Sequence, residues 1–186
     1  MKEERTKKQR KNKNMQSSTV VKKVSKDTIQ TFKDQFVLKD FPIDVSMRAY
    51  ENGDVYIGQQ MNGYRSGLGT LYYGNGDIHT GNWYKDVKDG CGIYFTKEGT
   101  KYIGKWVGGK LNWDKNEIEY FDGSYYEGTL KNDKITGNGT MKYKNGDVYQ
   151  GEWKDGKWHG SGEIIYKSGR RLRGNFNENT LIKQIE

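Results

Sequence analysis

The sequence predicts an all-β chain that folds as an elongated, single-layer antiparallel β-meander of about five hairpins. A glycine-anchored pattern returns every 23 or 24 residues, apolar positions within each unit are two residues apart, and Asn-Gly-Asp turns separate the halves of several units. Hydrophobic residues make up 32% of the 186 residues, and the mean hydropathy is -1.06. Such a composition argues against a thick two-layer core, so a repeated structural unit has to hold the chain together.

The repeat is anchored on glycines spaced by 23, 23, 24, 23 and 23 residues: Gly58, Gly81, Gly104, Gly128, Gly151 and Gly174. We count offsets within a unit from this anchor. Aromatic side chains occupy most positions two before and two after the anchor, and paired glycines follow at offsets nine and eleven in most units. Since same-face residues are two apart, each unit is predicted to be two strands, with aromatic rings covering the gaps that glycines leave on the neighbouring strand.

The predicted turns contain an aspartate beside a glycine. Asn and Gly tolerate the positive φ of a tight turn, so Asn-Gly-Asp is a strong hairpin signal. We expect these carboxylates to stabilise their own turns and not to act in catalysis: Asp54, Asp77, Asp122 and Asp147.

The segment YQGEWKDGKWHGSG at residues 149–162 resembles the MORN (membrane occupation and recognition nexus) repeat almost letter for letter. The resemblance extends over residues 46–180. Proteins of this family are scaffolds at membrane junctions, cytoskeletal collars and ciliary radial spoke heads, and some dock a partner's segment along the groove of the sheet. Enzymes of the family carry a catalytic domain after the repeats, and none follows here, so the resemblance implies a chain that is not an enzyme.

The third unit departs from the pattern. One extra residue lies between Gly104 and Gly128, and Trp113-Asp114-Lys115-Asn116 replaces the expected glycine pair. A shift by one restores Ile118, Tyr120 and Gly123 to their places. The insertion predicts a bulge or kink, either as harmless drift of a tolerant repeat or as an irregularity that contacts a partner.

The N-terminal part has a different composition. Residues 1–26 hold ten of the 32 Lys and Arg residues and two of the 24 acidic residues, which leaves 22 of each in the rest of the chain. We expect a disordered basic tail over 1–26, a bridge with a short helix over 27–45, the repeat domain over 46–180 and a C-terminal end over 181–186. The tail could bind an anionic surface of lipid, nucleic acid or acidic protein through Lys7, Lys8, Arg10, Lys11 and Lys13.

No catalytic, metal or cofactor site is predicted. His79 occupies an aromatic position of the repeat and His159 a His-Gly position common in the family, and neither has Cys, Asp or Glu at a metal-ligand spacing. No apolar run approaches the roughly 18 residues of a membrane span, and no secretory signal is visible, so we expect a cytoplasmic protein.

The leading functional hypothesis is a scaffold or adaptor that docks proteins through the repeat sheet, in a cytoskeletal or ciliary, radial-spoke-like assembly. Aromatic residues anchor many interfaces, so the predicted partner-binding residues are Trp83, Trp106, Tyr120, Trp153 and Tyr166, with a purely structural ladder as their other interpretation. The alternative is a peripheral membrane protein that binds anionic phospholipid through the tail and the repeats. Nucleic-acid binding is disfavoured, since the sheet adds no basic stripe, and open sheet edges leave a homodimer open.

Overall fold

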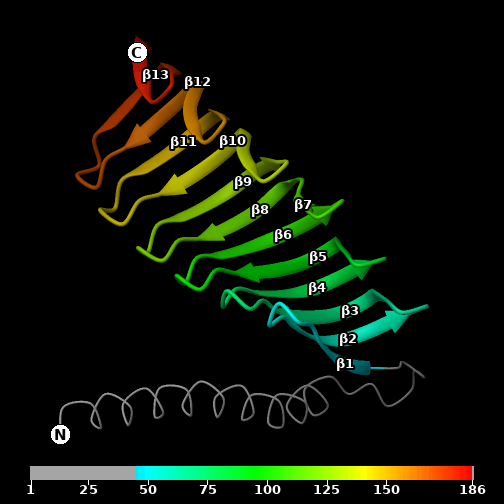
Figure 1. Cartoon of the computed structure of the whole chain (residues 1–186). Coiled ribbons are helices and arrows are strands. Elements are labelled where there is room, and N and C mark those ends of the chain that lie inside the picture. The colour runs from blue at the N-terminus through cyan, green and yellow to red at the C-terminus, as the bar shows by residue number, and fades with distance from the viewer. Residues whose placement is uncertain (1–44, 186) are drawn as a thin grey trace, which may run out of the picture. The chain divides into compact units, whose positions relative to one another are not determined.

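The computed structural model describes residues 45–185, which form one antiparallel sheet of 14 strands without helices in that range (Figure 1). The strands follow one another in chain order and the sheet does not close. The predicted basic tail and the short helix lie outside the described residues. The strands are β1 (Val45–Ala49), β2 (Val55–Met61), β3 (Tyr64–Tyr72), β4 (Ile78–Tyr84), β5 (Val87–Phe95), β6 (Lys101–Val107), β7 (Lys110–Leu111), β8 (Trp113–Glu119), β9 (Tyr125–Lys131), β10 (Lys134–Lys142), β11 (Val148–Lys154), β12 (Lys157–Ile165), β13 (Arg171–Asn177) and β14 (Thr180–Ile185).

The sheet is longer than the sequence predicted. About five hairpins with part-repeats were expected to end near residue 180, whereas β14 continues the pairing to Ile185. The inserted residue of the third unit divides its second half into the short β7, which pairs only with β6, and β8. Residues 181–185 are therefore part of the sheet and not a separate C-terminal end.

Two-residue turns form the hairpin tips at one side of the sheet. Both residues of each turn have φ between 46° and 84°: Asn62–Gly63, Lys85–Asp86, Gly108–Gly109, Asn132–Asp133, Asp155–Gly156 and Glu178–Asn179. Positive φ at both positions is the geometry of a type I′ turn, whose twist matches that of the flanking strands. This requirement explains why Asn, Asp and Gly dominate these positions.

A bulge near each tip bends the hairpin. The strands that follow most tips have nine residues against seven in the preceding strand, as in β3 against β2 and β12 against β11. The glycine at offset nine has positive φ, as in Gly67 at 86° and Gly160 at 55°, and the register shifts beside it. A bulge of this kind bends and twists the strand, so the tip curves over one face.

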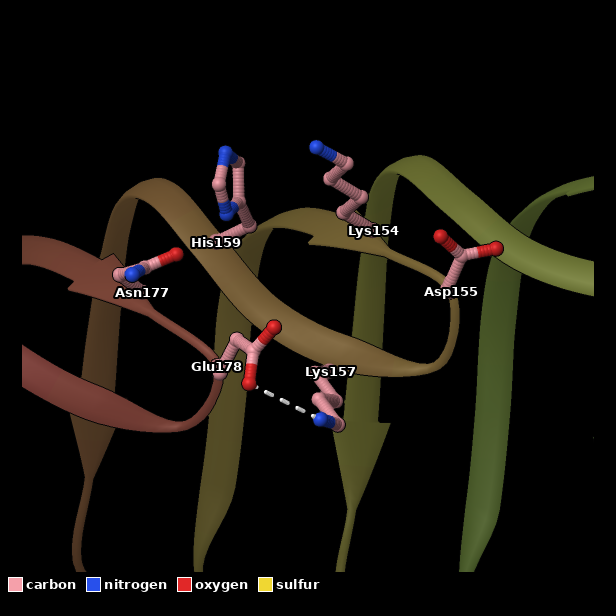
Figure 2. Close-up of a pocket in the computed structure, with 6 residues that line it drawn as sticks. All are labelled: Lys154, Asp155, Lys157, His159, Asn177 and Glu178. Carbon is pink, nitrogen blue, oxygen red and sulfur yellow. Dashed lines mark hydrogen bonds and ion pairs between the residues drawn. The ribbon is translucent and has the colours of Figure 1, made fainter.

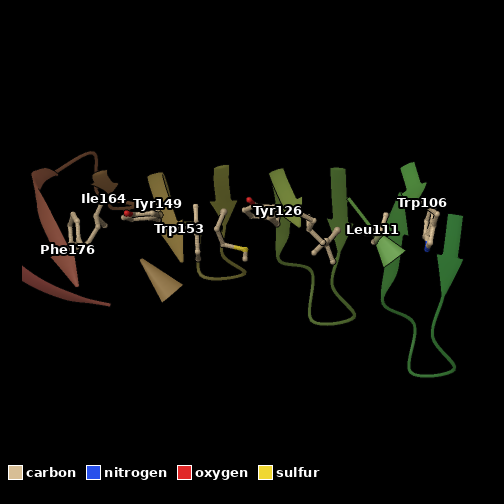
Figure 3. Packing of buried hydrophobic residues seen from close by; sticks show 10 residues of the cluster. Trp106, Leu111, Tyr126, Tyr149, Trp153, Ile164 and Phe176 are labelled. Atoms are coloured by element: carbon tan, nitrogen blue, oxygen red, sulfur yellow. The ribbon is translucent and has the colours of Figure 1, made fainter. Parts of the chain in front are cut away.

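That face, which we call the inner face, carries two clusters of buried hydrophobic side chains: a larger one from Trp106 to Phe176 (Figure 3), and a smaller one of Tyr56, Leu71 and Trp83. Tyr149 lies between Trp153 and Phe176, with ring centroids 5.0 and 5.5 Å apart and near-perpendicular planes. The Trp153 Nε1–H donates to the carbonyl of Gly139 in the preceding unit at 3.0 Å. Edge-to-face contacts of this kind stabilise aromatic pairs beyond their buried area, so the ladder joins each unit to its neighbours.

The anchor glycines are required by close contact between strands. A Cβ atom on Gly151 would lie 2.5 Å from the Cα of Gly162, its partner on β12, and a Cβ on Gly162 would collide with the Tyr149 hydroxyl. The predicted covering of glycines by aromatic rings is therefore present in the structure.

The turns at the other side tie successive units together. Asn75 Oδ1 accepts the N–H of Asp77 within its own turn at 3.0 Å, while Asp77 Oδ1 accepts the N–H of Lys97 in the next turn at 2.8 Å. The expectation that the aspartates stabilise their own turns is confirmed for Asp77, whose Oδ2 accepts the Asn75 side-chain N–H at 2.8 Å, and the same carboxylate also bonds forward to the next unit. The turn of the third unit has Asp122 at the position of Asn75 and Ser124 at the position of Asp77. Asp122 Oδ1 accepts the N–H of Ser124 within the turn, and Ser124 Oγ accepts the N–H of Lys144 in the next turn at 3.1 Å.

The predicted irregularity of the third unit is present. The pairing of β8 with β9 shifts between Trp113 and Asn116. Asn116 is fully buried, its Nδ2 donates to the Trp113 carbonyl at 2.6 Å, and its side chain fills the space beside Gly104 where other units have a glycine.

Candidate docking surfaces

The predicted partner-binding residues divide into two groups. Trp83, Trp106 and Trp153 are only 4%, 2% and 4% exposed. Neighbouring side chains cover them, so these indoles hold the core together and expose little surface to a partner, although Trp106 lines one hollow. Tyr120 and Tyr166 are half-buried and lie at the rim of the inner face.

The inner-face rim repeats a tyrosine at offset fifteen, with the count shifted by one in the third unit: Tyr50, Tyr73, Tyr120, Tyr143 and Tyr166. Burial raises the pKa of Tyr120 to about 12, so its hydroxyl stays protonated at neutral pH. Thr96 interrupts the row in the second unit and leaves room above the neighbouring rings.

A hollow of about 270 Å³ opens at this interruption. Its lining consists of Lys88, Tyr94, Thr96, Tyr102, Trp106, Gly109, Leu111 and Asp133. The Lys88 ammonium lies 4.7 Å from the centroid of the Tyr94 ring and 5.9 Å from that of Trp106. Burial lowers the pKa of Lys88, while Asp133 acts against this shift. The hollow thus combines an aromatic wall with one cation and one carboxylate.

A second surface lies on the outward side of the hairpin tips. Offsets three and six pair across each turn, and in the first three tips five of these six positions hold exposed apolar or aromatic side chains, while the sixth is Lys110. We define the apolar tip patch as Met61 (66% exposed), Tyr64 (50%), Tyr84 (59%), Val87 (41%) and Val107 (46%).

The tips that carry this patch are neighbours in space (Figure 1). The N–H of Asp86 donates to the carbonyl of Arg65 at 3.0 Å, and the N–H of Gly109 donates to the carbonyl of Lys88 at 3.0 Å. These bonds join the three tips into one continuous edge, so the apolar side chains of the patch lie along the same edge of the sheet.

The fourth and fifth tips carry lysine at the same two offsets, and the sixth carries Asn177 and Thr180. Lys131 pairs with Lys134, and Lys154 pairs with Lys157, across their turns. Two of these lysines are bound to the next tip: Lys134 to Asp155 at 3.0 Å and Lys157 to Glu178 at 3.1 Å. The edge therefore changes from apolar to basic along the chain.

A polar hollow of about 260 Å³ lies at this basic end (Figure 2). It is lined by Lys154, Asp155, Lys157, His159, Asn177 and Glu178, and the Lys157–Glu178 ion pair spans part of it. Within residues 45–185, no group of three or more His, Cys, Asp or Glu side chains is arranged to hold a metal ion. His159 is half-buried here, whereas His79 is buried among aromatic rings.

Sequence reasoning missed both the apolar tip patch and the place of Lys88. The signal lay in the aligned units. At offsets three and six the residues change from apolar to lysine along the chain, and at offset seven they change from basic to apolar. The prediction selected recurring aromatic residues as partner-binding residues, and most of these build the core of the sheet instead.

Comparison with known families places these units. The family model described as MORN repeat matches residues 56–78, 79–101, 126–148 and 149–170. The chain is a MORN repeat protein. The segment that the MORN model leaves out, residues 102–125, is the irregular third unit with β7 and β8.

Comparison with curated proteins finds no significant match. Among solved structures, the TCP domain of SAS-4 (dCPAP) of Drosophila melanogaster, in complex with a proline-rich motif of Ana2 (dSTIL), is 16% identical with a TM-score of 0.44 over 70% of this chain and 71% of that chain. The TCP10 domain of Danio rerio CPAP with a STIL peptide is 13% identical with a TM-score of 0.26 over 73% and 81%. A virginiamycin B lyase from Staphylococcus aureus is 17% identical with a TM-score of 0.19 over 75% and 43%. These values are too low to transfer a ligand or an activity to the MORN sheet.

Among the described residues there is no helix of the length and apolar character that a membrane span requires.

Proposed function

We propose that this MORN protein is a non-enzymatic adaptor that docks a protein partner on its repeat sheet. The observation that carries the proposal is the apolar tip patch. Large apolar side chains exposed side by side are unusual on a protein that works alone, and aromatic residues among them are typical binding anchors.

The repeat itself supplies an internal control. The same offsets hold Lys131 and Lys134, or Lys154 and Lys157, in tips of the same type I′ geometry. The hairpin therefore does not require Met61, Tyr64 or Tyr84 to be apolar for folding. A docking role accounts for apolar residues where lysine satisfies the fold equally well.

The resemblance to MORN scaffolds supports a cytoskeletal or ciliary, radial-spoke-like assembly as the setting, and it also supports the absence of catalysis. We propose both on that basis. The partner would cover the tips of the first three hairpins and leave the basic tips in water.

The test is a triple substitution of the patch, Met61→Lys, Tyr84→Lys and Val107→Lys, which copies the lysine found at the same offset in later tips. The matched control is Phe121→Lys with Ile182→Lys, since these side chains are 77% and 65% exposed but lie outside the patch. Affinity purification from the native cell, followed by measured binding of the purified partner, compares the variants with the wild-type chain.

We expect the wild type and the control to retain one fixed set of cytoskeletal or axonemal proteins, and the patch variant to bind the partner at least about tenfold more weakly, as for the loss of a hot spot. Retention of the same partner at equal affinity by the patch variant would refute the proposal.

The second candidate is a peripheral membrane protein, favoured by the concentration of the formal net charge of +8 in residues 1–26. Sedimentation with anionic vesicles tests it. Binding that weakens in high salt and disappears on deletion of residues 1–26 would support this function, and equal binding by the shortened chain would contradict it.

A further inference from the structure

Successive hairpin tips share a cation and a carboxylate in the first units. Arg65, at offset seven, binds Asp86, at offset five of the next unit: Nε to Oδ1 is 3.0 Å, and the Arg65 N–H donates to the same oxygen at 2.9 Å. The guanidinium also lies 4.5 Å from the centroid of the Trp83 ring. The cation at offset seven is thus neutralised from the next tip.

One unit later the cation is kept and its partner is missing. Lys88 occupies the place of Arg65, and Gly109 occupies the place of Asp86. Within residues 45–185 Lys88 forms no ion pair, although its ammonium is half-buried over Tyr94 and Trp106. Asp133 lines the same hollow and attracts this ammonium, but it does not form an ion pair with it. Burial of a charge without a direct ion pair is costly, so an anion that reaches this ammonium gains more than one that meets a solvated lysine.

Space for that anion is present. Gly109 has no side chain. Thr96 occupies a position where four other units and the N-terminal part-repeat have the larger tyrosine. Together these two small residues leave the hollow of about 270 Å³. Tyr94, Tyr102 and Leu111 offer apolar surface beside the ammonium. Gly109 lies two residues after Val107, so the hollow adjoins the apolar tip patch.

Asp133 limits which anion fits. It lines the same hollow, and its Oδ1 accepts the Leu111 N–H at 2.7 Å. A carboxylate opposite Lys88 repels a multiply charged phosphate more strongly than it repels a single carboxylate. The charges favour a singly charged acid with apolar neighbours.

We propose that this hollow binds an acidic side chain of the docked partner, with its carboxylate on Lys88 and the flanking apolar residues on the rings. This inference rests on the proposed docking function and names the chemistry of one partner residue. The partner's carboxylate takes the space beside Gly109. In the preceding tip, the carboxylate of Asp86 takes the equivalent place beside Arg65.

The repeat suggests a substitution that removes the site without removing Lys88. Gly109→Asp recreates the partner that Arg65 has. It should fold, because Asp86 adopts φ of 68° at this turn position and Gly109 has φ of 84°, and the nearest atom to an added Cβ is 3.5 Å away, on Val87. The matched control is Gly156→Asp, which makes the same change in a tip whose preceding unit has Ile135 in place of a cation.

The probe is the blocked peptide acetyl-Leu-Glu-Leu-amide at millimolar concentrations, titrated into the full-length ¹⁵N-labelled chain and followed by amide chemical shifts. We expect shifts around Lys88, Gly109 and Leu111, and binding weakened roughly tenfold in Gly109→Asp and in Lys88→Met but unchanged in Gly156→Asp. The glutamine peptide acetyl-Leu-Gln-Leu-amide should bind the wild-type chain as weakly as the acidic peptide binds Gly109→Asp and Lys88→Met.

Several results would overturn the inference: no shifts with the wild type, equal binding of the glutamine peptide, equal binding by Gly109→Asp, or tighter binding of inorganic phosphate than of the acidic peptide. Unchanged circular dichroism of the variants shows that a loss is local. Failure here leaves the docking function to the triple substitution of the apolar tip patch, whose readout does not involve Lys88.

Discussion

Replacement of His79 by tyrosine should stabilise the sheet, and increasingly so in acid. His79 lies two positions before its anchor, where other units have Tyr56, Tyr126 and Tyr149. Each of those hydroxyls donates to the backbone carbonyl three residues later, as Tyr149 does to Glu152 at 3.0 Å. His79 makes no such bond: it is 1% exposed, and neither ring nitrogen has a hydrogen-bond partner among residues 45–185.

The surroundings of His79 allow the larger side chain. The imidazole lies between Trp83 and Trp106, with centroids 5.2 and 4.8 Å away, and packs over Gly92 as Tyr149 packs over Gly162. A tyrosine hydroxyl at position 79 would reach the carbonyl of Asn82. Near neutral pH, one added hydrogen bond and the removal of an unsatisfied buried group should raise the free energy of unfolding by about 1–3 kcal/mol.

Acid adds a second contribution. Burial, and to a smaller extent Lys88, lowers the pKa of His79 from 6.5 to about 3. Between these two pKa values the imidazole is protonated in the unfolded chain and neutral in the folded chain. The contribution of His79 to the free energy of unfolding is therefore complete above pH 6.5 and declines as the pH falls toward 3. At pH 5 the decline amounts to about 2 kcal/mol, and tyrosine does not titrate there.

Urea unfolding followed by tryptophan fluorescence at pH 7.5 and pH 5.0 measures both contributions. The advantage of His79→Tyr over the wild type should grow by about 2 kcal/mol between the two pH values. His159→Gln is measured beside it, since this half-buried histidine is the other one of the two in the chain. An advantage of His79→Tyr that is the same at both pH values would refute the account of a neutral, desolvated imidazole.

The remaining predictions concern the core of the sheet. Gly151→Ala should cost about 3 kcal/mol because its Cβ meets the Gly162 backbone at 2.5 Å, while Gly156→Ala, with free space but φ of 80°, should cost about 1 kcal/mol; equal thermal shifts would contradict this. Trp153→Phe should lower stability by about 1–3 kcal/mol in urea, since it leaves the Gly139 carbonyl without its donor, and an unchanged midpoint would argue against that bond. Burial raises the pKa of the inner-face tyrosines, so in an alkaline absorbance titration part of the 14 tyrosines should ionise only as the sheet unfolds; a single transition near the ordinary pKa of 10 would refute their burial.

Much of the fold was predictable because its determinants are local. The 23-residue step, the two-residue period and the glycine-rich turns each act within one unit, and copying them along the chain specifies strand order and antiparallel pairing. The single insertion before Asn116 likewise predicted which unit is irregular, and the structure divides that unit into β7 and β8. Sheet ends were less predictable, because β14 lacks the full motif and is held by its pairing with β13.

The candidate sites depended on contacts between units. On a flat ribbon Trp106 and Trp153 would face outward as anchors, but the bulge beside each tip bends the hairpin over the inner face and covers them. In the sequence Lys88 looks like an ordinary surface lysine. The pairing of tips shows that the residue in the place of a counter-ion is Gly109, which has no side chain. The sequence alone thus determined the repeating sheet, whereas tertiary structure decided which side chains are exposed and which charges are paired, since both depend on bends and contacts about one repeat apart.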